Sequence, residues 1–184
     1  MTEASPLKRE AEAIIAELGL LDLARSHGRA EVVGSVALDL IVKLDIDIHL
    51  LVDTDDPFAV TDPLYHALLE DARIHEVRIS DYRADGGIKV GIDAYEGPSG
   101  VWSIDLWITD RVETTAFDYV RALRRRLTPE HRDAIMAIKR SYHARGALRD
   151  GISRRIYDAV VEKGVRSEDE FRRYLEWVRR GSLV

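Results

Sequence analysis

Two aspartates one residue apart, Asp45 and Asp47, stand in an otherwise apolar stretch that runs from Leu44 to Val52. Because successive side chains of a strand point to opposite faces, both carboxylates share one face, and the neighbouring leucine and isoleucine residues share the other. Two carboxylates this close repel each other and lose hydration, so the pair is costly unless a cation lies between them. The spacing therefore predicts a metal-dependent site.

A third aspartate, Asp105, repeats this pattern in the middle of the apolar stretch from Trp102 to Ile108. If this strand lies beside the Asp45 strand, the three carboxylates converge and can hold one or two Mg²⁺ ions, which prefer oxygen ligands. Two metal ions can clamp the attacking and leaving oxygens of a phosphoryl displacement. The alternative is a set of strand-edge carboxylates bonded to backbone groups or arginines. Since buried acids usually need a charged partner, we favour the metal site.

A Gly-Ser pair, Gly34 and Ser35, follows a short predicted strand from Ala30 to Val33. Glycine lets a phosphate approach the backbone, and the serine hydroxyl and nearby N–H groups can bind it. Taken alone, an ordinary strand-to-helix turn explains the pair equally well. Lys89, on the polar side of another predicted strand, could reach the same phosphate or the acceptor, although a solvated hairpin face is the default interpretation.

Three further features have a structural interpretation that we favour over a catalytic one. His49 shares the face of Asp45 and Asp47 and could touch phosphate or metal, but a surface histidine or one that supports the site is the better prediction. Trp107 could stack on a nucleobase, but packing against a helical bundle would bury more of its apolar area. Positive charge at 124–126 complements a helix C-terminus, with phosphate or RNA binding as the minority interpretation.

The hydrophobic pattern of the first half predicts the elements that position the acids. Helical spacing of apolar residues predicts a helix from Pro6 to Ser26, broken near Gly19, and a second helix that is capped by Thr61 and ends near Arg73. From residue 75 the period changes to two, which predicts a hairpin that turns at residues 85–87 and then a strand over 101–109.

After Asp110 the pattern becomes helical. It predicts one helix from Val112 to Leu127, a second capped at Thr128, a third around residues 152–160 and a last one opened by a capping box at Ser167. The expected fold class is α/β (α+β), a mixed sheet flanked by helices. Residues 1–110 would form the sheet domain with its N-terminal helix, and residues 111–184 a helical region packed on it.

Composition narrows the function classes. With 46% hydrophobic and 33% charged residues the 184-residue chain has the balance of a globular protein. It has no cysteine, which excludes disulfides and thiolate zinc sites and permits a cytoplasmic location. No apolar run approaches membrane-spanning length, and no signal-peptide core is predicted. The net charge of −6 makes nucleic acid an unexpected partner, because the phosphate backbone favours an excess of lysine and arginine.

Three motifs of this chain together resemble a known signature. They are Val33-Gly34-Ser35, Leu44-Asp45-Ile46-Asp47-Ile48 and Ile104-Asp105-Leu106. The signature is the hydrophobic-Gly-Ser, Asp-x-Asp and third-Asp pattern of the DNA polymerase β-like nucleotidyltransferase superfamily. The resemblance covers residues 30–110 and extends to the minimal, small-substrate members and to the GrpB-like branch, and similar minimal members carry a helical C-terminal region.

The resemblance implies a mixed sheet, a nucleoside triphosphate bound with two Mg²⁺ ions, and transfer of the nucleotidyl group to an acceptor hydroxyl. By position, Gly34 and Ser35 would hold the triphosphate and Asp45 and Asp47 would bind both metals. Asp105 would bind the catalytic metal and help to deprotonate the acceptor. ATP is the expected donor. The acidic balance and small size of the chain favour a small-molecule hydroxyl as acceptor over tRNA or DNA. Two alternatives are a weak or inactive nucleotide-binding or protein-interaction module, as in an antitoxin, and a protein AMPylase.

Overall fold

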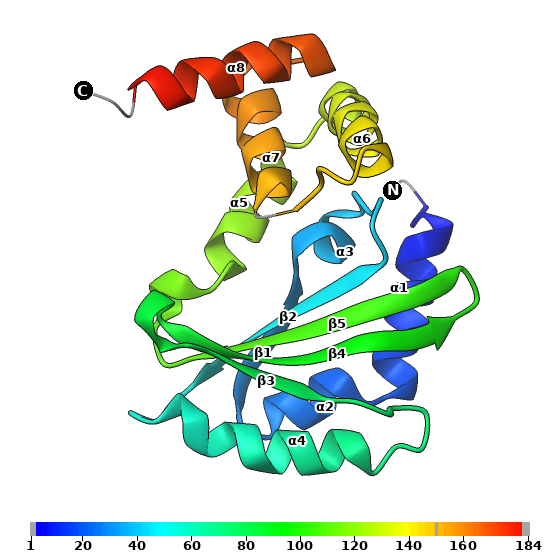
Figure 1. Cartoon of the computed structure of the whole chain (residues 1–184), viewed down its shortest axis with the longest axis vertical. Coiled ribbons are helices and arrows are strands. Elements are labelled where there is room, and N and C mark those ends of the chain that lie inside the picture. Colours follow the sequence, from blue (N-terminus) through cyan, green and yellow to red (C-terminus); the bar gives the residue numbers. More distant parts are fainter. Residues whose placement is uncertain (1–2, 150, 182–184) are drawn as a thin grey trace. The chain divides into compact units, whose positions relative to one another are not determined.

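The computed structural model describes residues 3–149 and 151–181. The chain folds into two compact units that divide between Arg121 and Ala122, somewhat beyond the boundary at residue 110 that the sequence indicates. The first unit contains a sheet with helices, and the second contains helices (Figure 1). Helix α5 (Phe117–Arg126) includes the point of division.

The first unit is built on a five-stranded mixed sheet in the order β1-β2-β5-β4-β3. Strands β2 and β5 pair in parallel, and the other three pairs are antiparallel. The predicted mixed sheet is therefore confirmed, and the two aspartate-bearing strands are neighbours. The strands are β1 (Gly28–Val33), β2 (Asp45–Val52), β3 (Arg78–Tyr82), β4 (Gly87–Gly97) and β5 (Gly100–Thr109).

One face of the sheet carries the hydrophobic core. The apolar residues that alternate with the aspartates, such as Ile46, Ile48 and Leu106, are fully buried. They join a single apolar cluster with residues of α1 (Pro6–Glu17), α2 (Leu20–Arg25) and α4 (Thr61–Leu69), which lie on that face (Figure 1). Because side chains alternate along a strand, burial of this set leaves the aspartates on the opposite face.

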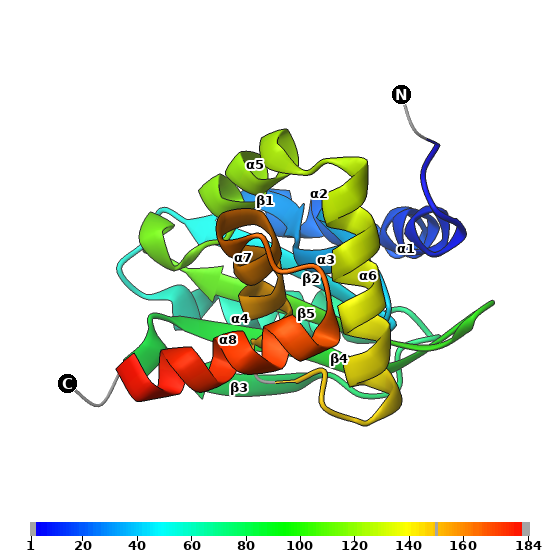
Figure 2. The same ribbon diagram turned by 90° about the horizontal axis from the view of Figure 1, so that it is seen from above.

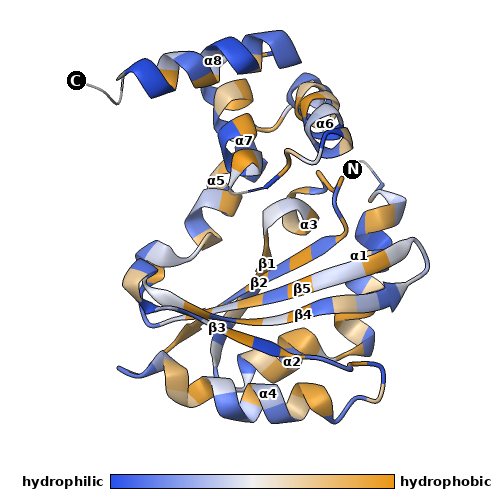
Figure 3. Ribbon diagram, viewed as in Figure 1, coloured by the Kyte–Doolittle hydropathy of each residue, from blue (hydrophilic) through white to orange (hydrophobic). Residues whose placement is uncertain are grey.

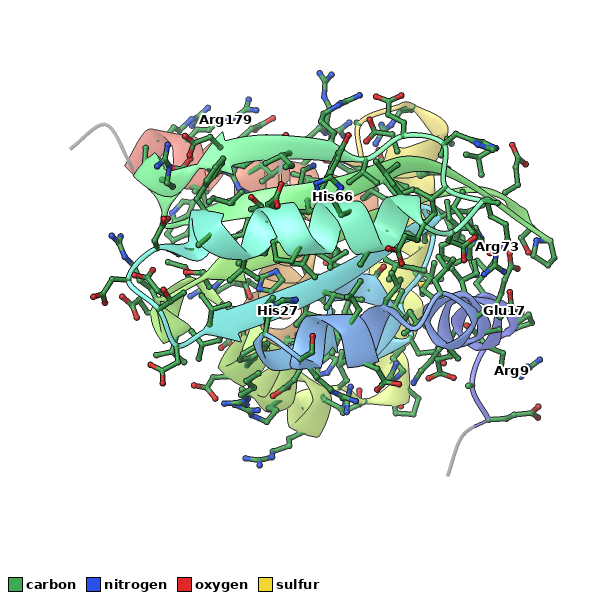
Figure 4. The ribbon with its side chains drawn as sticks, turned by 90° about the horizontal axis from the view of Figure 1, so that it is seen from below. Arg9, Glu17, His27, His66, Arg73 and Arg179 are labelled. Atoms are coloured by element: carbon green, nitrogen blue, oxygen red, sulfur yellow. The ribbon has the colours of Figure 1, made fainter. Side chains whose placement is uncertain are left out.

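The N-terminal helix is interrupted where the sequence predicts it. Ser5 caps α1 by accepting a hydrogen bond from the Lys8 N–H, and Gly19 then takes a φ of +59° before α2 begins. Glycine reaches this left-handed conformation without a steric penalty, so it permits the sharp change of direction. Arg73 pairs with Glu17 of α1 at 3.4 Å and ties the segment after α4 to the end of that helix (Figure 4).

The cap and the end that the sequence predicts for the helix at Thr61 are both wrong. A 3₁₀ turn, η1 (Pro57–Val60), precedes α4 and is capped by Asp56, while the Thr61 hydroxyl donates to the Phe58 carbonyl instead of capping α4. This turn continues directly into α4, so no cap is needed at Thr61, and α4 ends at Leu69 instead of near Arg73.

The helix expected from Val112 begins later. Val112 opens a short 3₁₀ turn, η3 (Val112–Thr114), and is exposed, and α5 starts at Phe117. The apolar residues Val112 and Ala116 match a helical spacing, but Phe117 is the first residue of this segment that enters the core. Two other short elements complete the unit, α3 (Gly34–Leu38) and the 3₁₀ turn η2 (Arg83–Asp85).

The second unit contains the end of α5 and three further helices that contact one another (Figure 2). Helix α6 opens with the predicted cap at Thr128, which accepts a hydrogen bond from the His131 N–H. Helix α8 opens with Ser167 accepting from the Glu170 N–H. The helices are α6 (Pro129–Ala144), α7 (Ile152–Lys163) and α8 (Glu168–Gly181). Within the described residues, no helix combines the length and the apolar character needed to cross a membrane.

We predict that Glu10→Ala destabilises the first unit by about 1–3 kcal/mol, because it leaves a buried donor without its acceptor. The Glu10 carboxylate accepts from the Ser99 N–H at 2.9 Å and from the indole N–H of the fully buried Trp102 at 2.8 Å. Urea unfolding measures the loss. Glu12→Ala on the same helix, which removes an exposed carboxylate paired with Lys8, is the control and should change stability by under about 0.5 kcal/mol. Equal effects of the two variants would contradict this account.

Candidate active site

The candidate site lies on the polar face of the sheet, where β2 and β5 pair in parallel. Asp47 stands directly beside Asp105 in the pairing register, and Asp45 stands beside Ser103. Directly paired residues share a face, with side chains about 5 Å apart at their bases. The structure thus brings the three predicted aspartates onto one face of neighbouring strands.

Gly34 and Ser35 open α3 immediately after β1 and reach the same acids. Gly34 has a φ of +61°, and a Cβ atom at this position would lie 2.4 Å from an Asp47 carboxylate oxygen. The buried Ser35 donates a hydrogen bond from its hydroxyl to Asp45 at 3.4 Å. The glycine is therefore required both by the backbone conformation and by the closeness of Asp47.

Two lysines neutralise the outer acids. The Lys89 ammonium on β4 lies 3.2 Å from Asp105, and the two side chains are 31% and 35% exposed. Lys43 lies 3.6 Å from Asp45 and is more exposed. These partly exposed pairs gain little net energy individually, but they place positive charge where the carboxylates of one face repel one another.

The donor chemistry of the face suits a hard cation such as Mg²⁺. Asp45, Asp47 and Asp105 supply only oxygen ligands, and Gly34 leaves space beside Asp47 that a larger residue would fill. In the described part of the chain, no three acidic or histidine side chains already stand close enough to hold a metal ion. The residues fit the ion by chemistry and by shared face, and the metal ligands stay a prediction.

His49, two residues beyond Asp47, has a structural role: its side chain contacts other residues of the first unit. Its Nδ1 accepts a hydrogen bond of 3.0 Å from the Ala116 N–H, and its ring lies between those of Trp107 and Phe117. Burial lowers the pKa of His49 to about 4, because charging the imidazole would cost hydration. The neutral ring fixes the segment before α5 against β2.

Trp107, two residues beyond Asp105, lies over the backbone of β4. A Cβ atom at Gly87 would lie 2.4 Å from its ring, and Tyr82 and His49 flank it with ring centroids 5.9 and 6.4 Å away. Its indole N–H is buried and has no hydrogen-bond partner among the described residues. The ring is thus packed within the first unit, next to the row of carboxylates.

Sequence reasoning missed two residues that shape the site. Gly91 faces Asp105 across the β4–β5 ladder, and a Cβ atom there would lie 3.1 Å from an Asp105 oxygen. A lone glycine inside an alternating strand signals such a close approach. Lys43 carried no comparable signal, since a lysine beside a strand end is ordinary on a protein surface.

We predict that Gly34→Ala destabilises the first unit by about 1–3 kcal/mol more than Gly19→Ala, because the added methyl group meets the Asp47 carboxylate. Gly19 is a matched control, with a φ of +59° against +61° and no heavy atom within 4 Å of the added carbon. Both variants strain the backbone alike, so the difference isolates the contact with Asp47. Urea unfolding measures both free energies, and equal losses would show that Gly34 is required for its backbone conformation alone.

Comparison with solved structures finds this fold in RNA-acting polymerases. The polymerase core of TRAMP, an RNA surveillance complex, matches with a TM-score of 0.60 and 18% identity over 86% of this chain and 50% of that one. The Cid1 poly(U) polymerase with MgGTP bound matches with a TM-score of 0.58 and 16% identity over 77% of this chain and 44% of that one. A cytoplasmic RNA terminal U-transferase matches with a TM-score of 0.52 and 14% identity over 73% and 41%.

The chain spans half or less of the length of these polymerases. No family model matches it, and no curated protein does. At this level of identity the likeness establishes the fold, and it confirms the predicted mixed sheet flanked by helices. The chain therefore has the nucleotidyltransferase fold that these polymerases share.

Proposed function

We propose that the first unit catalyses Mg²⁺-dependent transfer of a nucleoside monophosphate, from ATP, to a hydroxyl group, with pyrophosphate as product. The observation that carries this proposal is the pairing of Asp47 with Asp105 on one face, with Gly34 directly beside Asp47. Three carboxylates next to a Gly-Ser turn suit the binding of cations and phosphates together, which is what the chemistry of a triphosphate requires.

Each residue has a proposed task. Asp45, Asp47 and Asp105 would hold two Mg²⁺ ions, which when bound supply positive charge to the triphosphate. Gly34 and Ser35 would hold the phosphates through the backbone and the hydroxyl group. Lys89, which pairs with Asp105, would turn to a phosphate oxygen. Asp105 would take the proton of the acceptor hydroxyl. The oxygen of that hydroxyl would bond to the α-phosphorus, and the bond from this phosphorus to pyrophosphate would break.

For the acceptor we propose a small molecule that carries hydroxyl groups. Residues 1–121 contain 24 acidic residues against 11 lysines and arginines, a net charge of −13. A field of this sign disfavours a polyanion on the unit that carries Asp47 and Asp105 and tolerates a neutral or cationic acceptor.

The hydroxyl of an RNA end is the second candidate acceptor. Residues 122–184 carry 16 lysines and arginines against nine acids, a net charge of +7, which would attract RNA to the second unit. The polymerases of the same fold act on RNA by their descriptions, which supports this candidate by analogy of fold only.

We predict that Asp47→Asn and Asp105→Asn each lower the rate of pyrophosphate release from ATP and Mg²⁺ by at least about 100-fold, because each removes a charge that holds a cation at the reacting phosphate. The assay supplies, in separate reactions, a panel of aminoglycosides, lincosamides and other polyols, and a single-stranded RNA. The reaction that raises release above the acceptor-free rate identifies the acceptor class.

The control for this assay is Asp93→Asn on β4, which removes an exposed carboxylate that pairs with Arg78. This variant should release pyrophosphate at the rate of the unaltered chain. Equal release by the unaltered chain and by both site variants would eliminate the mechanism. Release by the unaltered chain no faster than without protein would leave a non-catalytic nucleotide-binding or protein-interaction module as the interpretation of the fold.

A further inference from the structure

Arginines are concentrated in the last three turns of α8, the last helix of the second unit, whereas its first turn is acidic. Of the 16 basic residues in 122–184, 14 are arginines, and four of them lie in the last three turns of this helix. Hydrophilic residues occur along most of its length (Figure 3). We define the arginine face of α8 as Arg172, Arg173, Trp177, Arg179 and Arg180.

The two sides of α8 differ sharply. Phe171 is fully buried, and Tyr174, Leu175 and Val178 follow at helical spacing on the inner side. The arginine face lies on the other side, and its five residues are exposed. Arg179 of this face is labelled in Figure 4. The inner side accounts for the packing of the helix, so the arginine face is not needed to hold the unit together.

Trp177 is the unusual residue of this face, because it is 64% exposed. Tryptophan is enriched at interfaces, where its ring buries a large apolar area, so a tryptophan this exposed points to a binding partner. Arg173 lies four residues before it and Arg180 three residues after it, which places both guanidinium groups beside the indole ring. The Tyr174 ring lies 6.3 Å from the Trp177 ring and supports it from the inner side.

We propose that the arginine face of α8 binds single-stranded RNA. Guanidinium groups pair with phosphate oxygens, and an exposed indole offers a flat surface on which an unpaired base stacks. A duplex hides its bases and leaves the indole without a partner. The strong preference for arginine over lysine also favours unpaired RNA, whose bases stack on guanidinium planes as well as on aromatic rings.

Acids offset only part of the charge of this face. Glu176 is exposed on the same side, so residues 171–181, with four arginines and this one acid, keep a net charge of +3. Asp169 pairs with Arg172 at 2.7 Å and leaves Arg173, Arg179 and Arg180, for which no ion pair with an acid is found among the described residues. The proposal concerns binding alone, and it holds or fails independently of nucleotide transfer at Asp47 and Asp105.

The test is fluorescence anisotropy of the full chain with a labelled 20-nucleotide oligo(U), in EDTA and without nucleotide, so that failure of the transfer chemistry cannot affect it. Trp177→Ala should weaken binding about tenfold through loss of stacking. The double variant Arg173→Gln/Arg180→Gln should lower the slope of log affinity against log salt by about 1.4, because two phosphate contacts are lost.

The control is Arg9→Gln, which removes one exposed arginine from helix α1 of the acidic unit and should leave the affinity unchanged. Circular dichroism checks that each variant keeps its helices. Three results would overturn the proposal: no binding of oligo(U) at about 50 mM salt, binding that neither α8 variant weakens, or binding of single-stranded DNA, duplex DNA or anionic phospholipid vesicles as tight as that of oligo(U).

Discussion

The pairing of Asp47 with Asp105 on adjacent parallel strands is the constraint on which the candidate site depends. The apolar residues between the aspartates fix this register, because Ile46 and Ile48 on β2 and Leu106 on β5 are fully buried. A slip of one residue would turn the acids into the core and the apolar side chains into water. The hydrophobic core therefore holds two like charges side by side, and Lys89 offsets part of their repulsion.

Much of this arrangement could be predicted from local pattern. The alternation in β2 and β5 predicted both strands and which face their acids occupy, and Gly34 marked a close approach to the backbone. The pairing of β2 with β5 could not be predicted from alternation alone, since strands distant in sequence leave no local mark of their neighbour. The convergence of the three carboxylates was therefore expected only on the condition that these two strands are adjacent. The contacts of Lys43 and Gly91 with the acids could not be predicted, because they depend on that pairing. The cap at Thr61 and the helix start at Val112 were wrong because a short 3₁₀ turn precedes each helix and shares the spacing of a first helical turn.

The partner that net charge favours changes when the charge is counted for each unit separately. The net charge of −6 for the whole chain led to the prediction that nucleic acid is not a partner, and it combines −13 in residues 1–121 with +7 in residues 122–184. The acidic unit carries the carboxylates that suit cations, and the basic unit carries the arginine face of α8. The proposed RNA site runs against the prediction from total charge, and the small-molecule acceptor rests on the acidic unit alone. The two proposals therefore depend on different parts of the chain.

The central claim is that Asp45, Asp47 and Asp105 form one site for a nucleotide together with Mg²⁺. Calorimetric titration with a non-hydrolysable ATP analogue tests it most directly, because binding is measured without turnover or acceptor. The claim predicts that Mg²⁺ tightens binding by at least about tenfold, since a nearby cation favours the charged carboxylates and phosphates, and that Asp47→Asn and Asp105→Asn each abolish this gain. Binding that is indifferent to Mg²⁺, or equally strong in both variants, would contradict it.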